Sequence, residues 1–187
     1  MLELGRLLRH QKLARTVRFV AFANEEPPFF HTNLMGSLVY ARRCRQRDEN
    51  IVGMITPETI GCYFDEPKTQ SFPFPLCWLY PSVGNFIAFV GNAASHDLVK
   101  RVTNSFRAGT QFPAVGFAAP KWVTQAGWSD HWSFWQCGYP GLMMTDTAPL
   151  RYRYYHTPQD TPEKIDYDRT ARVVAGLARV IAELARE

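Results

Sequence analysis

The sequence lacks the features of membrane proteins, of disulfide-rich proteins and of zinc ribbons. No apolar run in its 187 residues approaches the roughly 20 residues of a membrane-spanning helix, so no membrane partner is expected. The cysteines are far apart and include no C-x-x-C pair, which argues against a ribbon or redox motif and predicts reduced thiols. The first residues, MLELGRLLRHQKLAR, are amphipathic and resemble no export signal, so a soluble, cytoplasmic protein is expected.

Repeats, low-complexity tracts and linkers are also missing, which predicts a single domain over residues 1–187. A chain of this length buries about 70% of the surface that its unfolded form exposes, so its core needs neither a disulfide nor a structural metal. The formal charge is +4, and four arginines cluster within 42–47. Because that predicted helix also carries acidic residues and no interleaved aromatic residues, nucleic-acid binding is not expected.

Hydrophobic periodicity predicts an α/β fold. The β-branched and aromatic residues at 17–23 predict a buried strand, and a helix over about 33–48 leads to a second strand at 51–55. This β-α-β order favours a mostly parallel or mixed twisted sheet flanked by helices. Further strands are expected at 86–91 and 140–146, and further helices at 97–109, at 131–138 and after a cap at Asp168. A long loop is expected between Gly61 and Gly84, and a second loop over 110–130 with room for one short strand.

Acidic and imidazole side chains follow three of the predicted strands. Glu25 and Glu26 follow the first strand, Glu58 follows the second, and His156 lies in the loop after the last. Because ligands bind where the carboxyl ends of strands gather in an open α/β sheet, we expect these side chains to converge. Adjacent carboxylates can then divide the work, one binding a cation and the other deprotonating a water molecule. Taken alone, E-E-P-P is also typical of a solvated turn.

Six sequence blocks resemble one known family in the same order along the chain. They are V-R-F-V-A-F-A-N-E-E-P-P-F-F, G-S-L-V-Y-A, G-M-I-T-P-E-T-I-G, S-D-H-W-S-F-W, M-T-D-T-A and Y-H-T-P-Q-D-T-P-E-K-I-D-Y. The blocks are similar to those of the co-catalytic zinc exopeptidases of peptidase clan MH, in the bacterial branch that includes leucyl aminopeptidases, glutamate carboxypeptidase and glutaminyl cyclases. The resemblance covers residues 1–184 and implies hydrolysis of a terminal bond of a peptide substrate by zinc-activated water.

The resemblance implies a role for each candidate at the centre of the site. Glu25 matches the general base. Glu26 and His156 match ligands of one zinc ion, and Glu58 matches a ligand of a second zinc ion.

The resemblance also implies supporting residues. Asp130 and His131 match an S-D-H element that lines the site, with a helix cap by Asp130 and a packed His131 as the alternatives. Asp160 orients the His156 loop or caps a turn before Pro162. Aromatic residues of the two long loops either wall a substrate pocket or pack beneath the loops. These residues are Phe64, Phe72, Phe74, Trp78, Trp122 and Trp128.

Two ligand segments of this family, H-x-D and G-x-D-D-N-x-S-G, do not occur in the sequence. The resemblance places both before the first block, so we expect a chain truncated at its N-terminus that lacks the first strands. The full family site holds one or two zinc ions, and this chain is expected to bind zinc weakly or not at all. Missing strands leave a sheet edge for a homo-oligomer or another partner to cover. Three functions stay open: a metal-dependent peptidase, a non-catalytic binding relative, and an enzyme like glutaminyl cyclotransferases.

Overall fold

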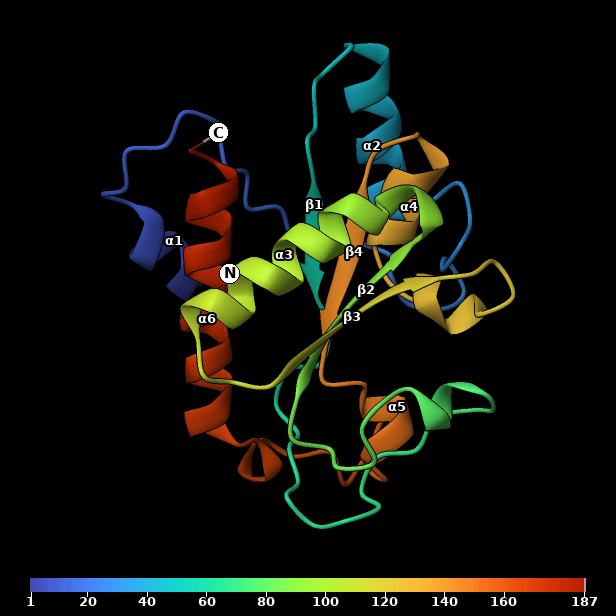
Figure 1. Ribbon diagram of the computed structural model, residues 1–187. Helices are drawn as coiled ribbons and strands as arrows, with labels where there is room; N and C mark the ends of the chain where they lie inside the picture. The colour runs from blue at the N-terminus through green and yellow to red at the C-terminus, as the bar shows by residue number, and fades with distance from the viewer. Residues whose placement is uncertain (187) are drawn as a thin grey trace.

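A twisted, mixed β-sheet lies at the centre of the molecule (Figure 1). The computed structural model describes residues 1–186, which form a four-stranded sheet in the order β1-β4-β2-β3. β1 runs parallel to β4, β2 runs parallel to β3, and β2 and β4 are antiparallel. The carboxyl ends of β1 and β4 therefore meet at one edge of the sheet. The strands are β1 (Met54–Pro57), β2 (Ile87–Asn92), β3 (Ala114–Ala119) and β4 (Gly141–Thr145).

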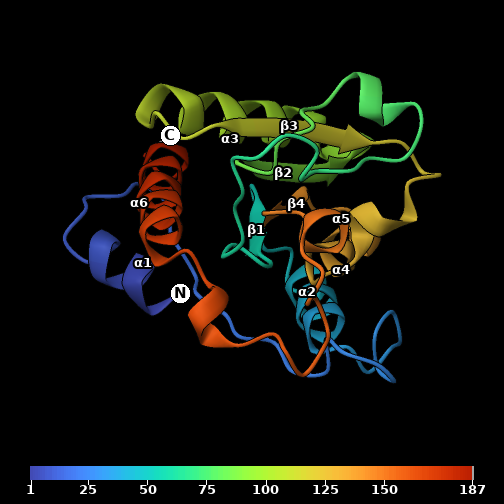
Figure 2. The same cartoon turned by 90° about the horizontal axis from the view of Figure 1, so that it is seen from below.

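Helices cover both faces of the sheet (Figure 2). One face packs against α1, α3 and α6, and the other packs against α2 and α4 near β1 and β4. Successive side chains of β2 point to opposite faces of the sheet, which explains this arrangement. Ile87 and Phe89 belong to the hydrophobic core shared with α1, α3 and α6, whereas Ala88 and Val90 belong to a second hydrophobic core beneath the loops on the opposite face. The helices are α1 (Leu2–Leu8), α2 (Gly36–Gln46), α3 (His96–Gly109), α4 (His131–Gln136), α5 (Ala148–Arg151) and α6 (Tyr167–Leu184), with short 3-10 turns at Leu76–Trp78, Ala93–Ser95, Thr124–Gly127 and Pro162–Lys164.

The strongest sequence patterns correspond to observed elements. The helices predicted at 33–48, 97–109 and 131–138 are confirmed as α2, α3 and α4. The strands predicted at 86–91 and 140–146 are confirmed as β2 and β4. The short strand allowed for within 110–130 is observed as β3.

The cap of the last helix was predicted at the wrong aspartate. Asp166 precedes α6, and its side chain accepts a hydrogen bond of 2.9 Å from the Arg169 N–H. Asp168 lies inside the first turn, where a carboxylate interacts favourably with the amino end of the helix but does not cap it. Both aspartates fit the composition of a helix start, so only the backbone geometry separates them.

The predicted strand at 17–23 does not form. Among the described residues, the backbone of 17–22 makes no ladder to any strand, so the predicted β-α-β unit with 51–55 is absent as well. The second strand also starts later than predicted, at Met54, whose N–H donates to the Pro140 carbonyl at 3.0 Å. β4 begins only after Pro140, which has no N–H to offer a ladder, so pairing with β1 begins there.

None of the helices within residues 1–186 combines the length and the apolar character needed to cross a membrane.

Two helical glycines predict opposite effects of the same substitution. A Cβ atom at Gly176 would lie 2.5 Å from Phe106 Cε2 and 2.7 Å from Thr110 Cγ2, because α6 and α3 approach closely there. We expect Gly176→Ala to lower the free energy of unfolding by about 1–3 kcal/mol through overpacking. At Gly5 the nearest atom, Phe19 Cε2, would be 3.9 Å away. Gly5→Ala is therefore expected to stabilise by up to about 1 kcal/mol through helix propensity. Urea denaturation of both variants checks this contrast, and a stabilising Gly176→Ala would contradict it.

Candidate functional site

Three chain segments bring the predicted acidic residues to the edge where β1 and β4 end. Glu58 follows β1 directly, and its N–H donates to the Met144 carbonyl of β4 at 2.9 Å. Glu25 and Glu26 lie in the turn between residues 17–22 and α2, while Asp130 lies immediately before α4. The acidic side chains were expected to meet where the strands end. Only Glu58 comes from a strand, β1, whereas Glu25 and Glu26 reach the carboxyl ends of β1 and β4 from a segment that pairs with no strand.

The carboxylates act on one another electrostatically. Burial raises the pKa of Glu25 to about 7, and the charges of Glu58, Asp130 and Glu26 add to this effect. Burial also raises the pKa of Glu58, with further contributions from Glu26 and Asp130, and burial raises that of Asp130. A pKa near neutrality suits a general base, because the group is basic enough to take a proton and is still ionised in part.

Glu58 is held in place by its neighbours. Its carboxylate accepts a hydrogen bond of 3.1 Å from the Ser129 hydroxyl, which lowers its pKa against the effect of burial. The Thr59 hydroxyl donates to the Glu58 carbonyl at 2.7 Å and lies 3.0 Å from the Thr145 hydroxyl at the end of β4. The position of Glu58 therefore depends on β4 and on the turn before α4.

His156 lies in an exposed loop next to the acidic group. Its ring stacks on Tyr155 at a centroid distance of 4.0 Å. The charge of His156 lowers the pKa of Glu58, whereas burial and the three glutamates raise the pKa of Tyr155. In the same loop Asp160 accepts a hydrogen bond of 2.8 Å from the Tyr152 hydroxyl. Asp160 thus contacts the chain that leads into the His156 loop.

Asp130 and His131 occupy different environments although they are adjacent. His131 is fully buried, its Nε2 lies 2.7 Å from the Ala126 carbonyl, and its ring meets Trp135 edge to face. Burial lowers the pKa of His131 to about 4, so the ring is neutral at pH 7. Asp130 occupies the N-cap position of α4, as the helix-cap alternative has it, but its side chain makes no cap hydrogen bond. The structure places His131 in the packed position and Asp130 in the acidic group.

Residues with positive φ angles gather around the candidates. Non-glycine residues adopt this conformation rarely, and such backbone strain concentrates at functional sites. The positions at or beside candidate residues are Asn24 (φ 60°), Thr59 (φ 45°) and His156 (φ 56°). The chain bends sharply where it presents Glu25, Glu58 and His156.

Asp146 supports this site but was not among the residues predicted from the sequence. It follows β4, is fully buried, and its Oδ2 accepts hydrogen bonds of 2.8 Å from the N–H groups of Gly61 and Cys62. Its own N–H donates to the Thr59 carbonyl at 2.7 Å. The side chain therefore fastens the loop that leaves β1 just after Glu58. The sequence signal for this role of Asp146 was the position of an acidic residue directly after the apolar strand GLMMT.

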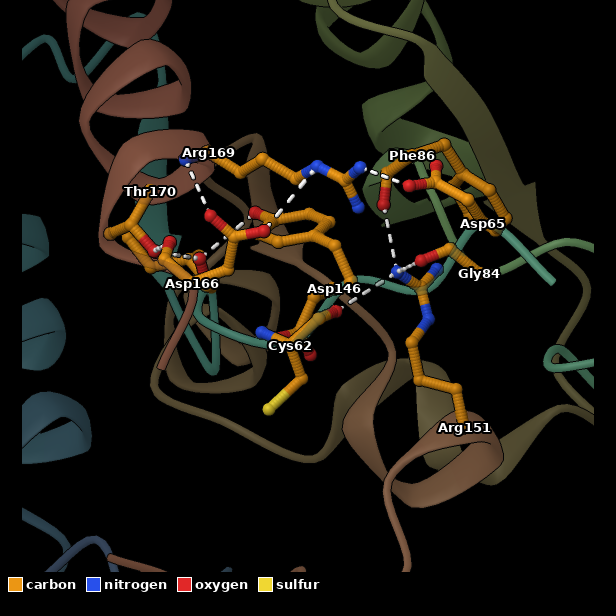
Figure 3. Close-up of polar contacts among 11 residues, drawn as sticks. Cys62, Asp65, Gly84, Phe86, Asp146, Arg151, Asp166, Arg169 and Thr170 are labelled. Carbon is orange, nitrogen blue, oxygen red and sulfur yellow. Dashed lines mark hydrogen bonds and ion pairs between the residues drawn. The ribbon is translucent and has the colours of Figure 1, made fainter. Parts of the chain in front are cut away.

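Arg151 anchors both ends of the long loop between β1 and β2 (Figure 3). Its Nη1 donates to the carbonyl groups of Cys62, Gly84 and Phe86 at 3.3, 2.9 and 3.0 Å, and its Nε donates to Gln70 Oε1 at 2.7 Å. Burial lowers the pKa of Arg151 to about 10, so it remains a cation at pH 7. The aromatic residues of this loop occupy two kinds of environment: some pack beneath the loop, and others are exposed to solvent.

Phe72 packs on Phe86 beneath the loop, as the packing alternative has it. Phe74 and Trp78 meet edge to face and are 70% and 78% exposed. Trp122 and Trp128, on the second loop, are also exposed. The exposed rings are free to meet a ligand, whereas Phe72 is not.

The described residues do not fit a complete metal centre. Within residues 1–186, no three His, Cys, Asp or Glu side chains form a group that could hold a metal ion. Glu26 and His156 both act on Glu58 electrostatically, but the three side chains form no group that could hold a metal ion. A structural or catalytic zinc normally needs three protein ligands or more.

An α/β scaffold that gathers carboxylates where its strands end has clear counterparts among known proteins. The chain belongs to Peptidase family M28, whose model matches residues 1–181. It is 38% identical over 183 residues to the uncharacterized protein YfbL of Escherichia coli (strain K12), covering 97% of this chain and 55% of YfbL. The chain thus spans about half the length of this relative.

Solved structures share the fold. The aminopeptidase from Aneurinibacillus sp. strain AM-1 matches with a TM-score of 0.65 and 24% identity over 99% of this chain and 37% of that one. BSAP, a zinc aminopeptidase from Bacillus subtilis, matches with a TM-score of 0.69 and 18% identity over 99% of this chain and 40% of that one. The mixed sheet flanked by helices that the sequence predicts is therefore confirmed.

The raised pKa of Glu25 predicts a pH-dependent stability in metal-free protein. The folded state holds a proton on Glu25 up to about pH 7, whereas the unfolded chain releases it near the ordinary value of 4.5. The free energy of unfolding should therefore fall as pH rises through this window. We expect Glu25→Gln to raise the melting temperature above about pH 8 and to change it little below about pH 4.

Glu3 provides the matched control for this experiment. It is exposed, and its hydrogen bonds from Arg6 lower its pKa, so its ionised form is favoured by folding. Glu3→Gln should give no stabilisation at high pH. Melting curves with a chelator present check both variants, and a destabilising Glu25→Gln at high pH would contradict the proposed environment.

The role of Asp146 predicts a difference between two substitutions. Asp146→Ala leaves the N–H groups of Gly61 and Cys62 without their acceptor, at a cost of about 1–3 kcal/mol in unfolding free energy. Asp146→Asn retains a carbonyl oxygen, so we expect a smaller loss. Denaturant titration measures both, and equal losses would show that accepting these bonds is not what Asp146 contributes.

Proposed function

We propose that the chain carries part of the catalytic site of an aminopeptidase-type hydrolase that cleaves a terminal bond of a peptide substrate. The observation that carries this proposal is the group formed by Glu25, Glu26, Glu58 and Asp130, with the pKa of Glu25 near 7. Membership of Peptidase family M28 supports it, as do the aminopeptidase structures that share the fold.

In this proposal Glu25 is the general base. Its carboxylate takes a proton from the water molecule that attacks the scissile carbonyl, and the same group can return the proton to the leaving amine. The carboxylates gathered around it create a negative potential. That potential attracts the positively charged α-amino group of a peptide and thereby favours substrates with a free N-terminus.

The assignment of zinc rests on the similar aminopeptidases and not on the arrangement of side chains in this chain. BSAP is a zinc aminopeptidase, and Glu26, Glu58 and His156 remain the proposed zinc ligands of this chain. Because no three His, Cys, Asp or Glu side chains of the described residues form a group that could hold a metal ion, we assign no catalytic step to zinc. The same observation favours a second candidate, a non-catalytic relative that binds peptides through the acidic site.

The test is hydrolysis of chromogenic aminoacyl substrates with and without added zinc. Glu25→Gln is expected to lower kcat by about 10²–10⁴-fold, because a general base contributes that much to proton transfer. Glu3→Gln, on exposed α1, is the matched control and should retain full activity. Activity that survives Glu25→Gln unchanged would rule out Glu25 as the base.

Measured zinc binding separates the two candidate functions. Titration calorimetry that finds one or two tightly bound zinc ions per chain, lost in His156→Ala, would contradict the non-catalytic alternative. A chain that binds no zinc and hydrolyses no substrate would contradict the proposed peptidase.

A further inference from the structure

The turn that carries Glu25 and Glu26 is closed by hydrogen bonds of its own. The Phe29 N–H donates to the Glu26 carbonyl at 3.0 Å. The Asn24 side chain donates to the Leu34 carbonyl at 3.2 Å. Because both bonds lie within the turn, they fix its shape but not its position relative to the other side of the site.

The other side of the site is the turn before α4. Its Ser129 hydroxyl donates to the Glu58 carboxylate at 3.1 Å, and Asp130 follows directly. The helices that continue from the two turns pack together, with the buried hydroxyl groups of Ser37 on α2 and Ser133 on α4 lying 2.8 Å apart. Helix packing therefore holds the two turns where they enter the helices, whereas the acidic side chains lie before the helices begin.

His31 links the two turns directly. Its ring stacks on Phe30 at a centroid distance of 3.9 Å and on Trp132 of α4 at 4.1 Å. Its Nε2 lies 3.1 Å from the carbonyl oxygen of Gly127, which is 96 positions further along the chain. Because a carbonyl oxygen only accepts hydrogen bonds, Nε2 carries the proton of this bond. One side chain of the first turn thus contacts both the second turn and the helix that follows it.

Core packing does not explain these contacts. His31 is exposed, and its φ angle of 57° lies in the left-handed region that non-glycine residues rarely adopt. Such a conformation persists where the surrounding contacts hold it, and it concentrates at functional sites. A ring that is both stacked and hydrogen-bonded is held in one orientation. It is therefore suited to setting the distance between two turns.

We infer that His31 is a positioning residue, which fixes the turn of Glu25 against the turn of Asp130. This inference rests on the proposed function, in which Glu25 is the general base. A displacement of about 1 Å in a catalytic group can cost ~10²-fold in rate, so a link between the two turns matters for catalysis. The ring and the Nε2 proton of His31 are both engaged within the chain. His31 therefore acts through the turn and not on the substrate.

Amide hydrogen exchange tests the link without depending on hydrolysis. In His31→Ala the Phe29 amide should exchange about two- to tenfold faster, the equivalent of one lost hydrogen bond, whereas the amides of β4 should keep their protection. His31→Gln retains a side-chain N–H that can donate to Gly127, so part of the protection should return. The matched control is His96→Ala. His96 is exposed and follows β2, which runs antiparallel to β4, so it lies at the opposite end of the sheet from the acidic residues.

Steady-state kinetics test the role in catalysis. His31→Ala should lower kcat by about tenfold or more and leave KM nearly unchanged, because the base is displaced while the substrate contacts remain. His31→Gln should recover part of this loss, and His96→Ala should match the unsubstituted chain. In a Glu25→Gln background His31→Ala should cause no further loss, because the base that it positions is gone.

Melting curves verify that all variants are folded, and the outcomes then separate the two hypotheses. An unchanged exchange rate at Phe29 in His31→Ala would show that the link does not hold the turn. Equal losses of kcat from His31→Ala with and without Glu25 would overturn the positioning role and leave Glu25 as the base. Activity that survives Glu25→Gln would overturn the proposed function and with it the catalytic role of His31, while the exchange rates still report the link itself.

Discussion

The pairing of β4 with β1 on one side and β2 on the other is the interaction on which the rest of the structure depends. Every residue of β4 is buried, and the strand joins a parallel neighbour to an antiparallel one. Its position determines where Glu58 leaves β1, through the bond to Met144, and where Asp146 fastens the following loop. The site is thus an extension of one buried strand.

Local sequence patterns predicted the elements whose partners lie within the chain. α3 and α6 show clear amphipathic periodicity, and the apolar runs of β2 and β4 are fully or almost fully buried. The segment 17–23 has an equally good strand pattern but forms no strand. Periodicity reports which faces of a segment are apolar, whereas a strand also needs a hydrogen-bonding neighbour, which no local pattern can supply.

The candidate site was predictable in composition and less so in geometry. Glu25, Glu58 and Asp130 influence one another as the strand ends and the family resemblance led us to expect. The burial of His131 and the role of Asp146 depend on tertiary packing, since Asp146 bonds to backbone groups more than 80 positions earlier in the sequence. The absence of a three-donor group in residues 1–186 is likewise a matter of distance, which residue types alone do not determine.

Backbone pairing and site chemistry are coupled through the segment that leads into Glu25. Residues 17–22 have no ladder, and the next turn carries Glu25 and Glu26. A general base must be held within a fraction of an ångström of its working position, and paired strands hold side chains more accurately than loops do. A strand that pairs with 17–22 would therefore restrict the motion of Glu25 without touching it. Repulsion within the acidic group counteracts this restriction of Glu25, because each ionised carboxylate raises the pKa of its neighbours and repels them. A bound cation removes that repulsion, so strand pairing and cation binding should reinforce one another in positioning the base.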